Sequence, residues 1–170
     1  MHRIPEHTIE SRPVLEAVCR RSVGKGKPLT LHAQMAHAPA VLAAYVGFRD
    51  AVDAHGTFPP AVKSAVMLAV SGAMHNAYAQ SINAMLAQRA GWSDQDVLEI
   101  RDGRLGRDHQ LSALLAVACD AATANGNVSD VRWMAARDAG WTDSELAELF
   151  LYIGLTTYVV EFVNYARTEA

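Results

Sequence analysis

The stretch that decides the fold runs from Phe58 to Trp92 and reads FPPAVKSAVMLAVSGAMHNAYAQSINAMLAQRAGW. The two prolines at its start suit the first turn of a helix, because proline lacks the N–H that this turn leaves unpaired. Apolar residues then recur at helical spacing on both sides of a polar break at His75 and Asn76, up to a glycine typical of a helix C-cap. The stretch therefore predicts two helices with a tight connection.

The rest of the chain also has the pattern of helices. Alanine is frequent, β-branched runs are few, and apolar residues recur at helical spacing nearly everywhere. A helix is expected over residues 8–21, a loop over 24–28, and a second helix from Pro39 to about His55. Further breaks fall at Gly56, Gly91, Gly103, Gly106, Gly126 and Gly140. These signals predict an all-α protein of about eight helices, with no strand.

A short internal repeat marks two of these helix ends. MLAQRAGW at residues 85–92 matches MAARDAGW at residues 134–141, and each copy runs into the spacing of a capping box. The glycine in each copy is expected in the left-handed conformation of a C-cap. Trp92 and Trp141 then follow as apolar staples against the next helix, so we interpret both as structural and not as ligand-binding.

The last predicted helix, within residues 144–167, is apolar on more than one face. Such a helix is buried, and a small domain rarely buries one by itself. We therefore expect the chain to form a homo-oligomer, which covers the excess apolar surface.

Composition narrows the partners and the compartment. The net charge of −3 does not favour a nucleic-acid partner. No apolar run approaches the ~20 residues that span a bilayer, and the first residues lack a signal-peptide core, so no membrane partner is expected. Cys19 and Cys119 lie far apart in the sequence. Two reduced thiols in a cytoplasmic protein are the simplest interpretation.

The frame of residues 58–92 resembles the carboxymuconolactone decarboxylase and AhpD-like alkylhydroperoxidase superfamily. The prolines, the AVS near the end of the first helix and the AG that ends the second carry this resemblance. It extends from about residue 31 to residue 168, through VSD at 128–130, AGWTDSEL at 139–146 and VNYA at 163–166. The resemblance implies an N-terminal helix and loop over 1–28, and an AhpD-like domain over 29–170 with an antiparallel helix pair around the site. It also implies a homotrimer or homohexamer.

The chemistry of that superfamily is not matched. Its redox site combines a glutamate, a C-x-x-C pair at a helix N-terminus and a histidine. The resemblance places the glutamate at Ser64, the cysteines at Asn76 and Ala79, and the histidine at Asn83. Without sulfur at these positions, no thiolate or disulfide forms there. The decarboxylase branch of the superfamily has a different pattern, which looks like a glutamate on the first helix and a Trp…His pair on the second. This chain does not match that pattern either.

Five polar residues around this vestigial site are the candidates for function. His75 is the candidate general base, with Tyr78 or Ser64 positioning a substrate, and Asn76 and Asn83 are the candidate substrate-binding residues. The resemblance implies that all five border one cavity. The N-terminus of the second helix suits a carboxylate or enolate, so the expected ligand is a small anion or carbonyl compound. The alternative is structural: His75 and Asn76 cap a helix, and Tyr78 packs.

Three functions remain open at this stage. The first is a non-redox small-molecule-binding protein or pseudoenzyme. The second is an acid–base enzyme of decarboxylase or isomerase type, which acts on a small carbonyl or carboxylate substrate through His75. The third is an alkylhydroperoxidase-like antioxidant protein, although Cys119 reads as a buried core thiol and Cys19 as a spectator. No cofactor is expected, and no metal, because His32 and His37 lack a third ligand at a suitable spacing.

Overall fold

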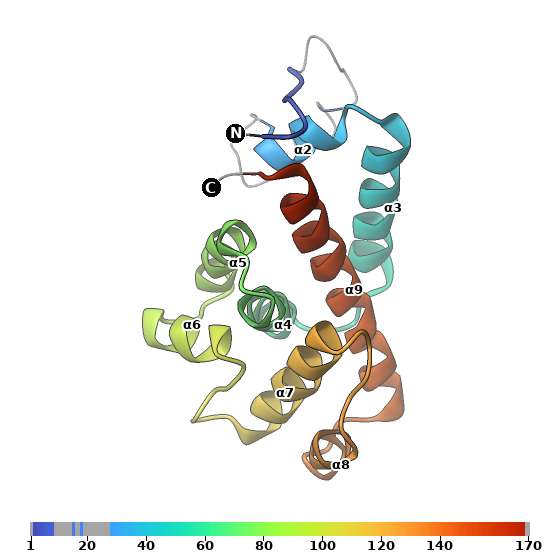
Figure 1. The fold of residues 1–170 in the computed structure, drawn as a ribbon. Helices are drawn as coiled ribbons and strands as arrows, with labels where there is room; N and C mark the ends of the chain where they lie inside the picture. Colours follow the sequence, from blue (N-terminus) through green and yellow to red (C-terminus); the bar gives the residue numbers. More distant parts are fainter. Residues whose placement is uncertain (1, 9–14, 16–17, 19–27, 169–170) are drawn as a thin grey trace. The chain divides into compact units, whose positions relative to one another are not determined.

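The chain is all-α in the part that its computed structural model describes, which is residues 2–8, 15, 18 and 28–168 (Figure 1). Eight helices and no strand occur in these residues, as predicted. Most of the helix predicted over residues 8–21 lies outside the described residues. The helices are α2 Thr30–Met35, α3 Pro39–His55, α4 Pro60–Ala73, α5 Ala77–Arg89, α6 Asp94–Arg101, α7 His109–Thr123, α8 Asp130–Asp138 and α9 Asp143–Ala166.

Proline and glycine set the helix boundaries where the sequence predicted them. α3 begins at Pro39 and ends at His55, just before Gly56, and α4 begins at Pro60. Gly91 and Gly140, which follow α5 and α8, have φ angles of 100° and 102°. The predicted left-handed caps are therefore confirmed.

The chain divides into two compact units. One comprises Met1–His55 with Glu161–Glu169, and the other comprises Gly56–Val160 with Ala170. The long helix α9 contributes residues to both units. The domain boundary expected between residues 28 and 29 stays a prediction.

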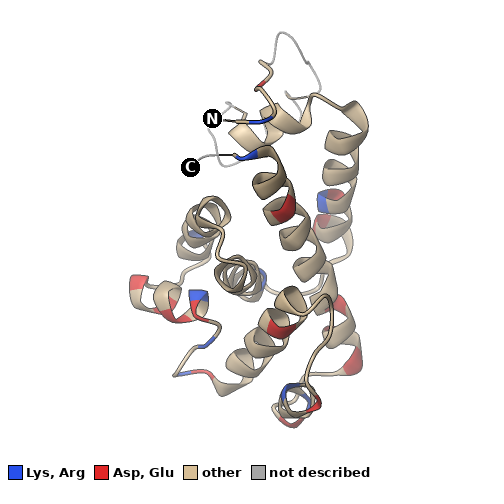
Figure 2. Ribbon diagram, viewed as in Figure 1, with Lys and Arg blue, Asp and Glu red and all other residues tan. Residues whose placement is uncertain are grey.

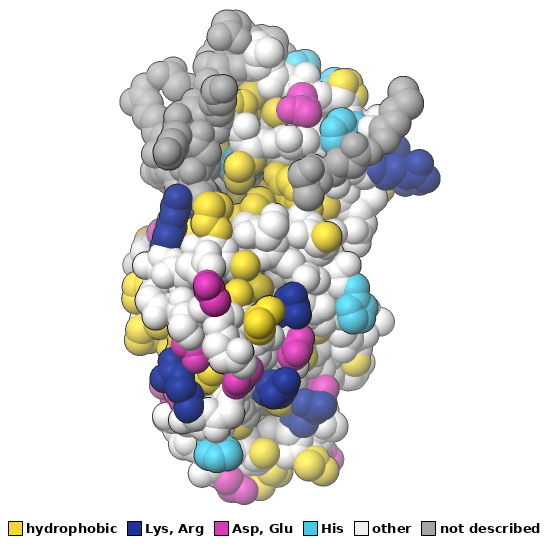
Figure 3. Space-filling view, turned by 90° about the vertical axis from the view of Figure 1, so that its left-hand side faces the viewer, with side chains coloured by type: hydrophobic (Ala, Val, Ile, Leu, Met, Phe, Trp, Pro, Cys, Tyr) yellow, Lys and Arg dark blue, Asp and Glu magenta, His cyan; other side chains and the backbone are white. Residues whose placement is uncertain are grey.

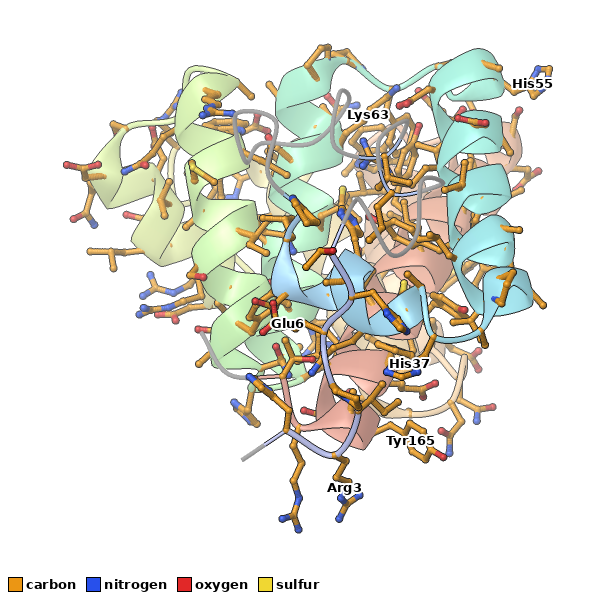
Figure 4. All side chains as sticks on the ribbon, turned by 90° about the horizontal axis from the view of Figure 1, so that it is seen from above. Arg3, Glu6, His37, His55, Lys63 and Tyr165 are labelled. Atoms are coloured by element: carbon orange, nitrogen blue, oxygen red, sulfur yellow. The ribbon has the colours of Figure 1, made fainter. Side chains whose placement is uncertain are left out.

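In the first unit, an N-terminal segment is hydrogen-bonded to α2 and to the end of α9. The Arg3 N–H donates to the carbonyl of Ala166 at 2.9 Å, and the His7 N–H donates to that of Ala33 at 3.1 Å. Figure 4 shows Arg3 and Tyr165 at this end of the unit. The buried Gln34 amide donates to the Ile4 carbonyl at 2.9 Å. The start of the described chain is thus held by several main-chain contacts.

A buried histidine lies between α2 and α3 of the same unit. His32 is 0% exposed, and its Nε2 lies 3.2 Å from the hydroxyl of Tyr45. Burial, with a smaller effect of the Arg49 charge, lowers the pKa of His32 to about 4. His32 is therefore a neutral core residue at physiological pH. His37 instead lies exposed beside His7, with the two ring centroids 4.2 Å apart.

Helix α4 is the centre of the second unit, where it packs against α5, α6 and α7 (Figure 1). Lys63 is its only charged residue, and Figure 2 shows how little charge α4 carries. Gly72 lets α4 approach α6 closely, because a Cβ at this position would collide with the carbonyl oxygen of Arg101. This close approach fixes the walls of the site described below.

The internal repeat has a structural counterpart. The indole N–H of Trp92 donates to the Ala61 carbonyl at 2.9 Å, and that of Trp141 donates to the Gln110 carbonyl at 2.8 Å. Each acceptor lies 31 residues before its tryptophan, in the first turn of α4 or of α7. The tryptophans are structural, as predicted, but the polar contact of each is with a helix that comes earlier in the chain.

Helix α9 corrects one expectation. It has 24 residues and contains an 18-residue window of mean hydropathy 1.6, so by length and composition it is able to cross a membrane. The statement that no apolar run approaches this length is therefore wrong. Of that window, 44% is buried within the protein. A core helix passes the same test, so α9 is only weak evidence for a membrane.

Candidate functional site

The candidate site begins at the turn between α4 and α5. His75 follows the C-cap of α4 and has a φ of 53°, which is the left-handed conformation. Its N–H donates to the Gly72 carbonyl at 3.0 Å, and the Asn76 N–H donates to that of Ser71 at 3.2 Å. These two bonds form a Schellman motif, in which glycine is the usual residue at the left-handed position. The exposed imidazole of His75 thus stands on a tight and specific turn.

Asn76 is the N-cap of α5. Its backbone is extended, with φ −98° and ψ 104°, and its side-chain oxygen accepts a hydrogen bond from the Ala79 N–H at 2.8 Å. The residue is 7% exposed. The structural interpretation of Asn76 is therefore correct, since its amide oxygen satisfies a main-chain donor of the first turn.

Two other predicted site residues bond to the main chain of α4. The hydroxyl of Ser64 donates to the Ala61 carbonyl at 2.9 Å, and the amide of Asn83 donates to the Met67 carbonyl at 3.2 Å. Both side chains are buried, as is Tyr78. The Asn83 contact, together with that of Gln80 with the Ser71 carbonyl at 3.3 Å, shows that α4 and α5 run antiparallel.

A cavity of about 440 Å³ opens beside the α4–α5 turn. Its walls come from the end of α4, the turn, α5, the end of α6 and α7. The lining residues are Gly72, Ala73, His75, Gln80, Arg101, Asp102 and Cys119. Of the five residues predicted for the site, His75 lines this cavity, and the other four do not. That all five border one common cavity stays a prediction.

Sequence reasoning missed the charged wall of this cavity. Arg101 and Asp102 end α6, far in sequence from His75, and no motif spacing connects them. The Nε of Arg101 lies 3.7 Å from one oxygen of Asp102, and Arg104 lies 3.8 Å from the other. Figure 3 shows the face that carries α5 and α6, where acidic and basic side chains are interspersed. The cavity therefore offers one fixed cation, one fixed anion and an imidazole.

The thiol in the cavity wall is poorly suited to redox chemistry. Burial raises the pKa of Cys119 to about 11, and the nearby charges of Arg132 and Asp120 act in opposite directions. The thiol donates to the Ala69 carbonyl, with Sγ 3.7 Å from the oxygen. A protonated thiol is a poor nucleophile. Cys119 is partly exposed, so the expectation of a buried core thiol was only partly correct. Cys19 lies outside the described residues.

A second polar cluster of this unit was not predicted from the sequence. The carboxylate of Glu148 accepts hydrogen bonds from the Thr57 N–H at 2.6 Å, from the Phe58 N–H at 3.0 Å and from the Tyr152 hydroxyl at 2.6 Å. The Thr57 hydroxyl also donates to it. Burial alone raises the pKa of Glu148, but these hydrogen bonds outweigh burial, and the net pKa is lowered. Every one of these donors is a group of the protein, so the cluster has a structural role. We call it the Glu148 clasp, because it links α9 to the loop before α4.

The described residues offer no metal centre. No three His, Cys, Asp or Glu side chains among them are arranged to hold an ion. The chemistry available at the cavity is therefore hydrogen bonding, ion pairing through Arg101, and proton transfer through His75.

Comparison with known proteins identifies the fold and a family region. Residues 39–105 match the carboxymuconolactone decarboxylase family. The debrominase Bmp8 has a similar structure, both alone and as a cysteine-to-alanine variant in complex with 2,3,4-tribromopyrrole. Each structure aligns with a TM-score of 0.85 and 17% identity, over 98% of this chain and 91% or 90% of that chain respectively.

A third similar structure is that of an uncharacterized peroxidase-related protein from Silicibacter sp. TM1040. It aligns with a TM-score of 0.75 and 13% identity, over 98% of this chain and 86% of that chain. No curated protein sequence matches this chain. The resemblance noted in the sequence is thus confirmed for the fold, and the match to the family model covers residues 39–105 of the chain. At these identities the structural matches establish the fold alone.

Proposed function

We propose that this chain, which carries a carboxymuconolactone decarboxylase family region at residues 39–105, is a non-redox small-molecule-binding protein. Its ligand occupies the cavity beside the α4–α5 turn. One observation carries the proposal: Asn76 and Ala79, where the resemblance places the redox cysteines, are joined by a helix-capping hydrogen bond of 2.8 Å. The two positions start helix α5, and they hold no sulfur.

The remaining thiol chemistry supports the same conclusion. An alkylhydroperoxidase-like activity needs a thiolate, and the raised pKa of Cys119 keeps this thiol protonated at neutral pH. The hydroxyl of Ser64 and the amide of Asn83, which replace proton-transfer groups in the resemblance, donate to carbonyls of α4. The antioxidant alternative therefore has no support beyond the family.

The fold is compatible with a small organic ligand. Bmp8, of the same fold, is described as a debrominase and was solved in complex with 2,3,4-tribromopyrrole. The cavity of about 440 Å³ lies in the range of small-molecule sites. From this similarity we propose only that this chain binds a ligand of comparable size, and we do not propose the same reaction.

A specific observation favours an acid–base enzyme as the second candidate. Glycine occupies the left-handed position that follows α5, α6 and α8, whereas α4 is followed by His75, as α7 and α9 are followed by the left-handed Asn125 and Arg167. A left-handed conformation costs a non-glycine residue about 1–2 kcal/mol. Strain of this kind is often found at functional sites, and the imidazole lines the cavity, where it is available as a general base.

Two measurements test the proposal. Peroxide consumption in the presence of dithiothreitol is expected to stay at the rate without protein, and Cys119→Ser is expected to change nothing. Peroxide turnover that disappears in Cys119→Ser would overturn the non-redox assignment. A screen of small molecules by thermal shift, with binding mapped by NMR, is expected to give ligands that perturb the Gly72 and Ala73 amides. Turnover of a ligand with a bell-shaped pH profile, lost in His75→Ala, would establish the acid–base enzyme instead.

A further inference from the structure

We propose that the cavity beside the α4–α5 turn selects small monocarboxylates and that Arg101 is the residue that anchors the carboxylate. This inference rests on the proposed function, because it needs the cavity to hold a ligand. It goes further in naming the anchor and the ligand class. Arg101 lies at the end of α6, outside the positions that the sequence pointed to.

The guanidinium of Arg101 has unused hydrogen-bonding capacity. Its one ion pair with a described residue is made through Nε, which lies 3.7 Å from Asp102. Among the described residues, no partner engages its two terminal NH₂ groups. The planar fork of arginine matches a carboxylate in bidentate geometry. Its side chain is 43% exposed in the cavity wall, so it is both accessible and partly shielded from water.

The neighbouring carboxylate of Asp102 leaves the terminal edge of this guanidinium open, because it lies 3.7 Å from Nε. The second oxygen of Asp102 lies 3.8 Å from Arg104, so two arginines share one aspartate. Arg104 is outside the cavity lining, which leaves Arg101 as the cation that faces the ligand. A monoanion that contacts the free edge of the Arg101 guanidinium is favoured over a cationic ligand by this positive charge.

The C-terminal ends of two helices lie at the cavity and disfavour a bound anion, but hydrogen bonds within the chain weaken this effect. α4 and α6 both end here, and the carbonyls of a helix C-terminus carry partial negative charge. However, two carbonyls in each last turn accept hydrogen bonds from residues beyond the helix. In α4, those of Ser71 and Gly72 accept from the turn, and in α6 those of Glu99 and Ile100 accept from the residues that follow. The positive N-terminus of α5 also begins at this turn.

The rest of the lining selects a compact and apolar tail. Gly72 and Ala73 present little more than backbone and a methyl group, and Cys119 presents a neutral thiol. Gln80 is the remaining polar group, and its amide nitrogen already donates to the Ser71 carbonyl. His75 and Asp102 complete the lining. The small apolar wall beside Arg101 suits a short aliphatic or single-ring carboxylic acid.

Isothermal titration of the full chain with benzoate and with benzamide, its neutral counterpart of equal shape, tests the inference. Benzoate is expected to bind at least about tenfold more tightly than benzamide. Arg101→Gln is expected to remove this preference, with benzoate affinity reduced about tenfold or more. Arg89→Gln is the matched control, because it removes an equal charge from an exposed position at the end of α5, outside the cavity. It is expected to leave benzoate affinity within about twofold.

A third variant acts in the opposite direction. Asp102→Asn removes the carboxylate that competes for Arg101, so benzoate affinity is expected to rise. Equal affinities for benzoate and benzamide, or unchanged benzoate binding in Arg101→Gln, would overturn the carboxylate class and leave the cavity as a site for neutral ligands. Absence of saturable binding of both probes at millimolar concentration would also overturn it, while the wider screen would decide the proposed function separately. Thermal unfolding of each variant confirms that it is folded.

Discussion

The side-chain oxygen of Asn76 lies 2.8 Å from the backbone nitrogen of Ala79, and it accepts that N–H as the N-cap of α5. The resemblance places a pair of redox cysteines at these two positions. In this chain the same two positions start a helix and do no thiol chemistry. The hydrogen bond therefore has a measurable structural role.

Removal of the Asn76 cap is expected to destabilise the protein. Asn76→Ala leaves the Ala79 N–H without its acceptor in a buried turn, at a cost of about 0.5–2 kcal/mol in the free energy of unfolding. Asn76→Asp keeps an acceptor at the positive end of α5 and is expected to stay near the original stability. Urea denaturation of the three proteins measures the difference. Equal loss in both variants would show that the cap is not what makes Asn76 important.

Substitution of His75 by glycine is expected to raise stability and to weaken ligand binding. His75→Gly relieves the left-handed strain but adds freedom to the unfolded chain, so the net gain is up to about 1 kcal/mol. Loss of the imidazole from the cavity wall is expected to weaken ligands found in the screen. Denaturation and titration of the same variant test both effects. Lower stability in His75→Gly would mean that the side chain contributes packing that outweighs its strain.

The reverse substitution at the repeat glycines provides the comparison. Gly91→Val and Gly140→Val place a β-branched residue at φ angles near 100° and are expected to destabilise the fold by about 1–3 kcal/mol. At Gly91 no atom lies within 4 Å of an added Cβ, so the backbone alone causes the cost. Unchanged melting of both variants would contradict the left-handed caps.

The Glu148 clasp is expected to depend on pH and on both carboxylate oxygens. In Glu148→Gln an NH₂ group replaces one acceptor and faces hydrogen-bond donors, which costs about 1–3 kcal/mol. Because the pKa of Glu148 is lowered in the folded state, the clasp contributes fully above the ordinary value of 4.5. The contribution is lost as the pH falls from there through the folded-state pKa.

Chemical denaturation at pH 7 and at acid pH measures this effect. Glu161→Gln is the control, because Glu161 is exposed on the same helix. The stability deficit of Glu148→Gln is expected to shrink in acid, whereas Glu161→Gln stays close to the original protein. A deficit that is constant with pH would show that the carboxylate charge is not involved.

Acid is also expected to destabilise the protein through His32. Its pKa is about 4 in the folded state and 6.5 ordinarily, so the unfolded chain takes up a proton first as the pH falls. Stability therefore decreases between pH 6.5 and about 4, by an amount on the order of 3 kcal/mol, and is unaffected by His32 above that window. His32→Gln removes this titration, and denaturation at pH 7.5 and pH 4.5 is expected to show a smaller loss in the variant. An equal loss would assign the acid sensitivity to other groups.

We propose that the chain forms a homo-oligomer, as the apolar last helix predicts, and that it is a homotrimer or homohexamer, as the resemblance implies. Large apolar side chains of the second unit remain exposed: Val131 at 80%, Met134 at 56% and Phe150 at 60%. Burial of such side chains against a second copy is favourable by about 25 cal/mol per Å². Sedimentation at micromolar concentration is expected to show an oligomer. The double variant Met134→Glu with Phe150→Glu is expected to dissociate it, whereas Ala43→Glu at an exposed position of α3 is not. A monomeric wild-type chain would refute the proposal.

The sequence by itself determined the helical scaffold around the site. Pro39, Pro60 and the glycines before Trp92 and Trp141 set helix starts and stops, because their effects on φ and on hydrogen bonding are local. The preference of asparagine for N-caps is equally local, and it predicted that Asn76 could cap a helix. Periodicity predicted the two helices α4 and α5, and the family resemblance predicted that they pack antiparallel.

Only the tertiary structure decided which residues meet. Arg101, Asp102 and Cys119 join His75 at one cavity because α4, bare of a side chain at Gly72, packs closely on α6. Glu148 closes on Thr57 and Phe58 across 90 or more residues of sequence. Such contacts depend on how helices pack, and packing joins residues whose separation in the chain carries no periodic signal. The resemblance therefore predicted a site around Ser64, Asn76 and Asn83, and packing provided a charged wall from a helix that no motif had marked.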